Sequence, residues 1–444
     1  MPPLSNQANA FNANYNSGKG NGKIDGCRFQ GSDINLLIIG TANNPRQLLR
    51  ISARFFEENG KIYVAYGSTK EETSVTKAGT NYLLKWVTKS ATNSTEHTIV
   101  LTPFKSPCFE YLTVKGRFVN DICGNSVILQ GVNIGSHNWG YGPLTSNADI
   151  LEIKKTNANT IRIPWYVQPT DPNQTLYTLR NLDSLIALCA QNQFITIVDV
   201  HDITTKNDAN LFQSIALNWW KRPDVVNLIK KYEKNLILNI ANEYGYYQWT
   251  GGGQAPKDAF EALYKGAITQ LRGAGIRVPI MIDAPDGGNA HEVLLEKGQS
   301  LLNHDPMKNV IFSVHTYWAR FKYNLDNAGN VINTKPNYLA DVQNQIANIK
   351  NSNLCFVLGE VANQQEGNVN CQYDITDVYK AVLTASQANS VSWLAWMWHY
   401  DFCPDRQMSN NNTFTNLSVF GNDIIYNTVY GLRLTTKPVK LSCL

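Results

Sequence analysis

The pattern of hydrophobic positions changes near residue 110. Before it, short runs rich in β-branched and aromatic residues alternate with turn clusters such as NNP, ENG and KAGT. Short strands at roughly ten-residue spacing predict a small all-β, sandwich-like domain over residues 1–108. The glycine-rich stretch 18–26 is interpreted as a flexible linker or turn. The strands of this domain are predicted at 34–42, 46–56, 61–68, 81–90 and 97–103.

Over residues 109–444 the pattern predicts an α/β fold, a (β/α)8 TIM barrel. Nearly continuous apolar runs alternate with helical stretches, as expected of parallel strands that are covered on both faces. Eight such runs over roughly 270 residues agree with this barrel in number and size. A doubly wound open sheet is the alternative, but GVNIGSHNWG lacks the G-x-G-x-x-G turn of such sheets. The strands are predicted at 127–135, 159–165, 194–201, 236–243, 278–285, 309–318, 355–362 and 391–401, and the helices at 148–156, 178–191, 209–220, 258–275, 294–303, 338–350 and 376–387.

Composition and charge narrow the classes of function. Charged residues make up 17% of the chain, and the net charge of +4 is spread without a basic block. This distribution argues against nucleic acid or a membrane surface as the main partner. No apolar run approaches the roughly 20 residues that cross a bilayer. Ten Trp and 21 Tyr suit a protein that stacks aromatic side chains against polar, ring-shaped ligands.

The eight cysteines indicate an oxidising compartment. No pair has the C-x2-C spacing of a structural zinc site. Cys189 and Cys355 lie in apolar segments and are interpreted as buried thiols, whereas the other six lie in polar stretches that are typical of disulfides. Cys27 and Cys108 bracket the first domain and could join its ends. The cysteines therefore indicate a secreted or periplasmic protein. The chain does not begin with a basic segment followed by an apolar one, so we expect the signal sequence to be absent from this chain.

Two carboxylates follow the carboxyl ends of predicted barrel strands, where the active site of a parallel barrel gathers. Glu243 ends the fourth strand and Glu360 ends the seventh, so the two face each other across the barrel mouth. Cleavage of a glycosidic bond needs such a pair, one protonated as general acid and one that attacks C1 or activates water. Either residue alone could be an ordinary charged strand end, but the coincidence of both favours catalysis. No metal and no cofactor is expected.

Six short motifs carry a resemblance to a known family. TIRIPW, VDVHD, IANEYG, SVHTYW, VLGEVA and WLAWMW resemble, in this order, glycoside hydrolase family 5 of clan A, from about residue 125 to about residue 402. The resemblance implies a retaining endo-β-1,4-glucanase or β-mannanase with Glu243 as acid/base and Glu360 as nucleophile. Family members usually have Asn-Glu-Pro, whereas here Tyr244 follows Glu243. The resemblance further implies substrate-binding roles for Arg162, His201, Asn242, His315, Tyr317 and a stacking tryptophan, Trp398 or, as second choice, Trp396.

Physical roles follow from these positions. Glu360 should stay ionised beside Arg162, and Tyr317 could donate a hydrogen bond to it. Glu243 should keep its proton, its pKa raised by the opposing carboxylate and by desolvation. Asn242 is placed to contact the 2-hydroxyl of the sugar. His137 and Trp139, after the first strand, are further candidates for a substrate subsite.

We therefore expect a monomeric enzyme whose partner is a polysaccharide. The first-ranked substrate is β-1,4-glucan, as for a cellulose-type endoglucanase, and the alternative is an endo-β-1,4-mannanase. A catalytically silent carbohydrate-binding protein on a hydrolase scaffold is the alternative from another class. The presence of both Glu243 and Glu360 argues against it.

The role of residues 1–108 is open between a structural brace, a carbohydrate-binding module and a spacer. Tyr63 and Tyr66 are three apart on a predicted strand and therefore lie on opposite faces. Tyr82 and Trp86 share a face, but one such pair is as easily a core layer. The link TPFKSPCFEYLTVKG contains no Gly/Ser-rich or Pro-rich tether, which favours the brace.

Overall fold

The computed structural model describes residues 109–134, 147–168 and 177–442, together with the strands of the first 108 residues that are given below. The chain divides into two compact units, Met1–Cys108 and Phe109–Leu444. None of the helices in the described part of the chain combines the length and apolar character that a bilayer crossing requires.

The elements described in the first unit are strands. Seven of them form one antiparallel sheet in the order β2-β1-β9-β8-β7-β6-β5, and β3 pairs with β4. The interpretation of residues 18–26 as a flexible linker or turn is wrong, because β2 pairs with β1 across this stretch. Residues 35–42 and 46–53, predicted as strands, lie outside the described residues. The strands are β1 (Phe11–Ser17), β2 (Gly20–Cys27), β3 (Phe29–Gln30), β4 (Asp33–Ile34), β5 (Arg54–Glu58), β6 (Lys61–Tyr66), β7 (Thr69–Ala78), β8 (Asn81–Lys89) and β9 (Ser94–Pro103).

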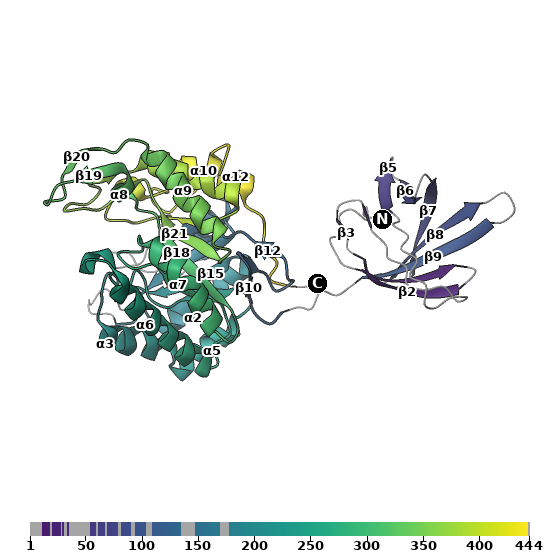
Figure 1. The fold of residues 1–444 in the computed structure, drawn as a ribbon, viewed down its shortest axis with the longest axis horizontal. Coiled ribbons are helices and arrows are strands. Elements are labelled where there is room, and N and C mark those ends of the chain that lie inside the picture. Colours follow the sequence, from purple (N-terminus) through teal and green to yellow (C-terminus); the bar gives the residue numbers. More distant parts are fainter. Residues whose placement is uncertain are drawn as a thin grey trace. The chain divides into compact units, whose positions relative to one another are not determined.

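Eight parallel strands of the second unit close into a barrel, which confirms the predicted (β/α)8 fold (Figure 1). Each strand pairs with the next along the chain, and β24 pairs with β13 to close the ring. Every strand lies within its predicted range and is shorter than predicted. The strands are β13 (Gln130–Asn133), β14 (Thr160–Trp165), β15 (Ile195–Val200), β16 (Leu236–Asn239), β17 (Ile280–Asp283), β18 (Val310–His315), β21 (Phe356–Val361) and β24 (Ser392–Ala395).

Helices surround the strands, and the seven predicted ones are present with shifted ends (Figure 1). The helix predicted at 209–220 contains a π-helical stretch in its middle. Helix α5 was not predicted, although Pro223 at its first turn and the spacing of its buried Val and Leu residues are ordinary helix signals. The helices are α1 (Asn147–Lys154), α2 (Leu179–Gln191), α3 (Ala209–Leu211), the π-helix η4 (Phe212–Leu217), α4 (Asn218–Trp220), α5 (Pro223–Lys231), η5 (Gln248–Thr250), α6 (Gln254–Gly273), α7 (His291–His304), α8 (Ala319–Lys322), α9 (Tyr338–Asn351), α10 (Thr376–Asn389), η6 (Pro404–Arg406), α11 (Val419–Tyr426) and α12 (Leu432–Thr435).

The barrel interior has two layers of different polarity. The layer nearer the amino ends of the strands is apolar and includes Ile197, Ile237, Met281 and Ile311. A small sheet of β10 (Thr113–Lys115), β11 (Phe118–Asn120) and β12 (Ser126–Val127) adds Leu112, Val119 and Val127 to this core. Side chains two positions further along a strand point to the same face. Those positions are Asp199, Asn239, Asp283 and Ser313, all buried, so the layer nearer the carboxyl ends is polar.

The segment after the last barrel strand is more buried than its composition indicates. Residues 403–416 are polar, a composition typical of a surface loop, but Arg406, Met408 and Ser409 are buried. A disulfide joins Cys371 to Cys403 at the start of this segment. The remaining short strands are β19 (Tyr323–Leu325), β20 (Val331–Thr334), β22 (Gln364–Gln365) and β23 (Tyr373–Asp374).

The redox state of the cysteines can be tested by alkylation. Cys189 and Cys355 are free and buried, as predicted, and burial raises the pKa of each thiol to about 12. Cys123 is also disulfide-bonded. We expect denatured, unreduced protein to be alkylated at Cys189 and Cys355 but not at Cys371 and Cys403, as read by peptide mass spectrometry. Native protein should resist alkylation at the same two thiols, and label on Cys371 without reductant would contradict the disulfide.

A second test concerns the close approach of β13 to β14 at Gly131. This glycine lies in β13 opposite Thr160, and a Cβ added there would stand 1.8 Å from the Thr160 carbonyl oxygen. Gly131→Ala should therefore push β13 from β14 and lower the free energy of unfolding by about 3 kcal/mol or more. Gly266→Ala is the matched control, because that glycine lies in α6 with open space around it. The Gly266→Ala substitution should raise the free energy of unfolding by about 0.5–1 kcal/mol. Urea unfolding measures both, and equal midpoints for the Gly131 variant and the unchanged protein would refute the argument.

Candidate active site

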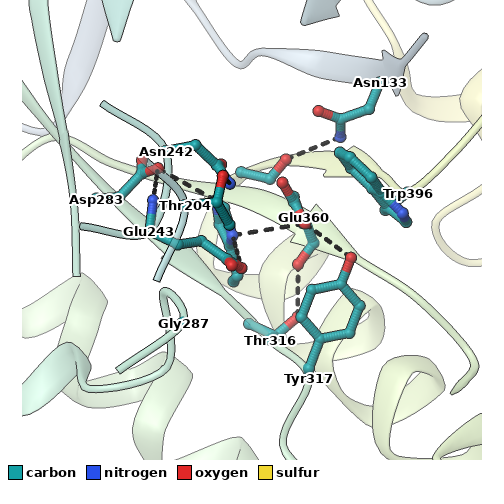
Figure 2. A network of polar contacts seen from close by, with 12 residues as sticks. Asn133, Thr204, Asn242, Glu243, Asp283, Gly287, Thr316, Tyr317, Glu360 and Trp396 are labelled. Atoms are coloured by element: carbon teal, nitrogen blue, oxygen red, sulfur yellow. Dashed lines mark hydrogen bonds and ion pairs between the residues drawn. The ribbon is translucent and has the colours of Figure 1, made fainter. Parts of the chain in front are cut away.

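Two carboxylates meet at the carboxyl ends of the barrel strands (Figure 2). Glu360 lies in β21, and Glu243 lies in the loop after β16 with a left-handed backbone, φ +48°. The backbone N–H of Glu243 donates to Asp283 at 3.1 Å, which holds this strained conformation. One side-chain oxygen of each glutamate and one nitrogen of His315 all lie within 4.8 Å of one another. The structure thus brings together the two residues that the strand-end argument paired.

The guanidinium of Arg162 binds several polar side chains of the site at once. It is fully buried, 0% exposed, and donates to Glu360 at 2.8 Å and to Asn242 at 2.6 Å. Two further carboxylates, Asp199 at 3.3 Å and Asp283 at 3.6 Å, complete its surroundings. Their charges raise the pKa of Arg162 despite burial, so the guanidinium stays charged. Two Asn side chains, Asn133 and Asn239, accept its remaining N–H groups.

Both oxygens of Glu360 are held. Arg162 donates to Oε1, and the Tyr317 hydroxyl donates to Oε2 at 2.7 Å, the hydrogen bond that the sequence predicted. Two donors on opposite oxygens fix the plane of the carboxylate and favour its charged form. Asn242 is held as well, since its Oδ1 accepts from Arg162 and its Nδ2 donates to Thr204 at 3.0 Å.

His315 connects the two glutamates. Its Nδ1 lies 2.8 Å from Glu243 Oε1 and 3.5 Å from Glu360 Oε2. Burial alone would lower the pKa of His315, but Glu360, Asp283 and Glu243 outweigh it and raise the pKa to about 9. The imidazole is therefore protonated at neutral pH and donates to Glu243.

The predicted order of the two glutamate pKa values is wrong for the substrate-free site. Burial would raise the pKa of Glu243, but the hydrogen bond and charge of His315 bring it below its usual value. Burial raises the pKa of Glu360 above its usual value, although His315 and Arg162 oppose it. The charge of Arg162 does not act on Glu360 alone, because Asp199, Asp283 and Glu243 share it. The charged His315 also lies closer to Glu243 than to Glu360.

His201 and Trp396 line another part of the site. His201 Nδ1 lies 2.9 Å from Asp199, which ties this ring to the group around Arg162. The rings of His201 and Trp396 are nearly parallel, 9° apart, with centroids 6.2 Å apart. Figure 2 places Trp396 next to Glu360.

The choice of Trp398 as the stacking tryptophan is wrong. Trp398 is 0% exposed in the hydrophobic core, and its indole N–H donates to Asn412, so it has no face to offer a sugar. Trp396 is the first residue after β24 and is 6% exposed. His137 and Trp139 lie outside the described residues.

The ring of Trp396 is held by a buried carboxylate. Its Nε1 donates to Asp401 at 2.6 Å, and Asp401 also accepts from Arg406 at 2.6 Å and from the Cys403 N–H at 2.9 Å. The guanidinium of Arg406 lies 5.6 Å from the centre of the Tyr317 ring. The segment after β24 therefore supports two aromatic side chains of the site at once.

Four polar residues of the site were not predicted from the sequence: Asn133, Asp199, Asn239 and Asp283. Asp199, Asn239 and Asp283 lie within or at the end of barrel strands, two positions after apolar residues of the inner layer. A strand-end search that included the fifth strand would have found Asp283, because it is the last residue of β17.

Known families were compared with the chain. The sequence profile of Cellulase (glycosyl hydrolase family 5) matches residues 121–402, well over half of the chain. The chain belongs to glycoside hydrolase family 5. It is thus a glycoside hydrolase, and the resemblance of its six motifs to this family is confirmed.

Individual family 5 proteins are similar over most of the chain. A mannan endo-1,4-beta-mannosidase from Salipaludibacillus agaradhaerens is 30% identical over 73% of this chain and 94% of its own length. A mannan endo-1,4-beta-mannosidase from Cellvibrio japonicus is 28% identical over 74% of this chain and 68% of its own. The crystal structure of a beta-mannanase from Streptomyces thermolilacinus with mannohexaose has a TM-score of 0.58 and 22% identity, covering 74% of this chain and 97% of that one. This last likeness shows that the fold is shared.

The charge on His315 should make stability depend on pH. A group whose folded pKa lies above its usual 6.5 contributes stability below that value and loses it as the pH rises through about 9. We expect the difference in unfolding free energy between the unchanged protein and His315→Gln to shrink by about 3 kcal/mol between about pH 6 and about pH 10. Urea unfolding at both pH values measures it. A difference for His315→Gln that stays constant between the two pH values would contradict the charged imidazole.

Proposed function

We propose that the protein is a retaining endo-β-1,4-mannanase, with Glu243 as acid/base and Glu360 as nucleophile. The observation that carries the retaining mechanism is the short separation of the two carboxylates, whose nearest oxygens lie within 4.8 Å. Retaining enzymes hold their carboxyl groups about 5–5.5 Å apart, whereas inverting enzymes leave about 6.5–9.5 Å for a water molecule. The short distance between Glu243 and Glu360 supports the retaining mechanism.

Mannan replaces glucan as the first-ranked substrate. The two relatives reported above are both named mannan endo-1,4-beta-mannosidase, and the Streptomyces thermolilacinus enzyme is a beta-mannanase with mannohexaose. The ranking of glucan first rested on motifs that glucanases and mannanases share, and these motifs do not describe the pocket around the C2 hydroxyl. A cellulose-type endoglucanase remains the second candidate, because the matching family is described as Cellulase.

The first chemical step forms a covalent intermediate. An oxygen of Glu360 attacks C1 of the sugar while Glu243 gives a proton to the glycosidic oxygen, which leaves with the rest of the chain. Arg162 and Tyr317 hold the attacking carboxylate in one orientation. Asn242 has one Nδ2 hydrogen beyond its bond to Thr204, and this hydrogen can reach the 2-hydroxyl of the reacting sugar.

His315 supplies the proton that Glu243 needs. In the substrate-free site the proton lies on the imidazole, 2.8 Å from Glu243 Oε1. Its transfer along this hydrogen bond leaves a neutral imidazole and a protonated Glu243, which is the general acid of the first step. In the second step Glu243 accepts a proton from the water that attacks C1, and Glu360 is released.

Trp396 is the proposed platform for the sugar at the cleavage point. It lies next to Glu360, and Asp401 fixes its ring through the indole N–H. Stacking on the apolar face of a pyranose needs a ring that does not rotate. We also propose that the enzyme acts as a monomer. A secreted or periplasmic location is proposed as well, since the Cys371–Cys403 disulfide is typical of oxidising compartments.

A panel of polysaccharides tests the substrate. Reducing sugar should appear from linear mannan and glucomannan at rates that exceed those from carboxymethylcellulose, barley glucan and xylan by tenfold or more, about 1.4 kcal/mol in transition-state binding. Glu360→Ala should release none from any of them and is the control for contaminating activity. Hydrolysis of carboxymethylcellulose with none of mannan would establish the second candidate instead.

Rescue by azide tests the two carboxylate roles. Glu360→Ala on an activated aryl β-mannobioside should regain turnover with azide and give the α-configured azide, because azide takes the place of the missing nucleophile. Glu243→Ala should lose about 10²–10⁴-fold on polysaccharide. Azide should then give the β-configured product, because the intermediate still forms on Glu360. Proton NMR assigns the anomers, and the same anomer from both variants would overturn the assignment.

A further inference from the structure

We propose that Trp249 forms a sugar-binding platform on the leaving-group side of the cleavage point, a proposal that rests on the glycanase function above. Trp249 is 55% exposed, whereas every other described tryptophan is buried. An exposed tryptophan leaves a large apolar face in water. A pyranose ring, with C–H groups on one face, is a ligand of matching shape and chemistry.

The backbone that carries Trp249 is held rigidly. The buried carboxylate of Asp286 accepts the consecutive N–H groups of Tyr247 and Gln248, both at 2.7 Å, and of Trp249 at 3.5 Å. Asp286 is itself fixed, because its own N–H donates to the Gly245 carbonyl at 2.9 Å.

The ring of Trp249 is flanked on two sides. The Tyr246 ring packs edge-on with its centroid 5.2 Å away, and the Tyr246 hydroxyl donates to the Thr205 carbonyl at 2.8 Å. Gly287 lies along the far edge of the indole, since a Cβ added there would stand in van der Waals contact with it at 3.4 Å. The aromatic face is thus both exposed and fixed in orientation, which lowers the entropy lost on binding.

The platform adjoins the catalytic glutamates through one short loop. Gly287 contacts Trp249, and the next residue, Gly288, lies so close to the His315 ring that a Cβ would come within 2.5 Å of it. The Gly288 carbonyl also accepts a hydrogen bond from the backbone N–H of His315 at 2.8 Å. His315 in turn binds Glu243, and Figure 2 shows Gly287 beside the Glu243 loop.

The barrel order gives the direction of the bound chain. Trp396 follows β24 and Trp249 follows β16, and three strands separate β16 from β24 on either side of the ring. The two tryptophans therefore belong to opposite sides of the barrel mouth, with Glu243 on the side of Trp249. A polysaccharide whose reacting sugar rests at Trp396 must leave past Glu243. Since Glu243 protonates the leaving oxygen, the sugar on Trp249 belongs to the leaving group.

The test compares substrates with and without sugars on the leaving-group side. Trp249→Ala should lower kcat/KM for mannohexaose about tenfold, through the loss of stacking. The same variant should stay within about twofold on an aryl β-mannobioside with a small leaving group, which does not reach Trp249. With mannobiose added as acceptor, Trp249→Ala should form less transglycosylation product than the unchanged enzyme. Trp249→Phe keeps a ring and should retain most of the activity, and Tyr426→Ala, at an exposed aromatic residue of α11, is the matched control.

Two outcomes would overturn the proposal. One is an unchanged kcat/KM for mannohexaose in Trp249→Ala. The other is an equal loss on the aryl glycoside, which would show that the substitution distorts Glu243 instead of removing a subsite. If the unchanged enzyme cleaves glucan and not mannan, the proposed substrate is wrong, and cellohexaose with an aryl β-cellobioside tests the platform in the same way.

Discussion

A single buried cation holds the active site of this glycoside hydrolase together. Removing the Arg162 guanidinium from water costs several kcal/mol, which only close carboxylates and amides can offset. Its partners come from five other strands or the loops that follow them: Asn133, Asp199, Asn239, Asp283 and Glu360. These groups meet only when the barrel strands have the correct register. The interaction that orients Glu360 therefore also selects one arrangement of the barrel.

The second charge of the site, on His315, changes how the two glutamates share protons. A pair of buried carboxylates at this distance would by itself keep one proton between them. The protonated imidazole adds a compensating charge beside Glu243, and it holds a proton 2.8 Å from Glu243 Oε1.

The sequence was sufficient for the barrel and for both glutamates, because buried parallel strands are recognisable runs and active residues follow their carboxyl ends. It was insufficient where contacts cross the barrel. Trp396 and Trp398 both come after the end of β24, where strand alternation no longer says which indole ring faces the active site. The polar segment after it is buried because Arg406 pairs with Asp401, a partner that composition does not reveal. The order of the glutamate pKa values depended on His315, which faces both.

The two layers inside the barrel have a consequence for how such an enzyme can be altered. The apolar half, around Ile237 and Met281, belongs to a hydrophobic cluster, whereas the polar half, around Asn239 and Asp283, is tied to Arg162. Volume-conserving exchanges in the first half tune rigidity and leave the charges near the substrate in place. Stability and chemistry therefore depend on different layers along the barrel axis. A designer can change the apolar layer without altering the residues of the site.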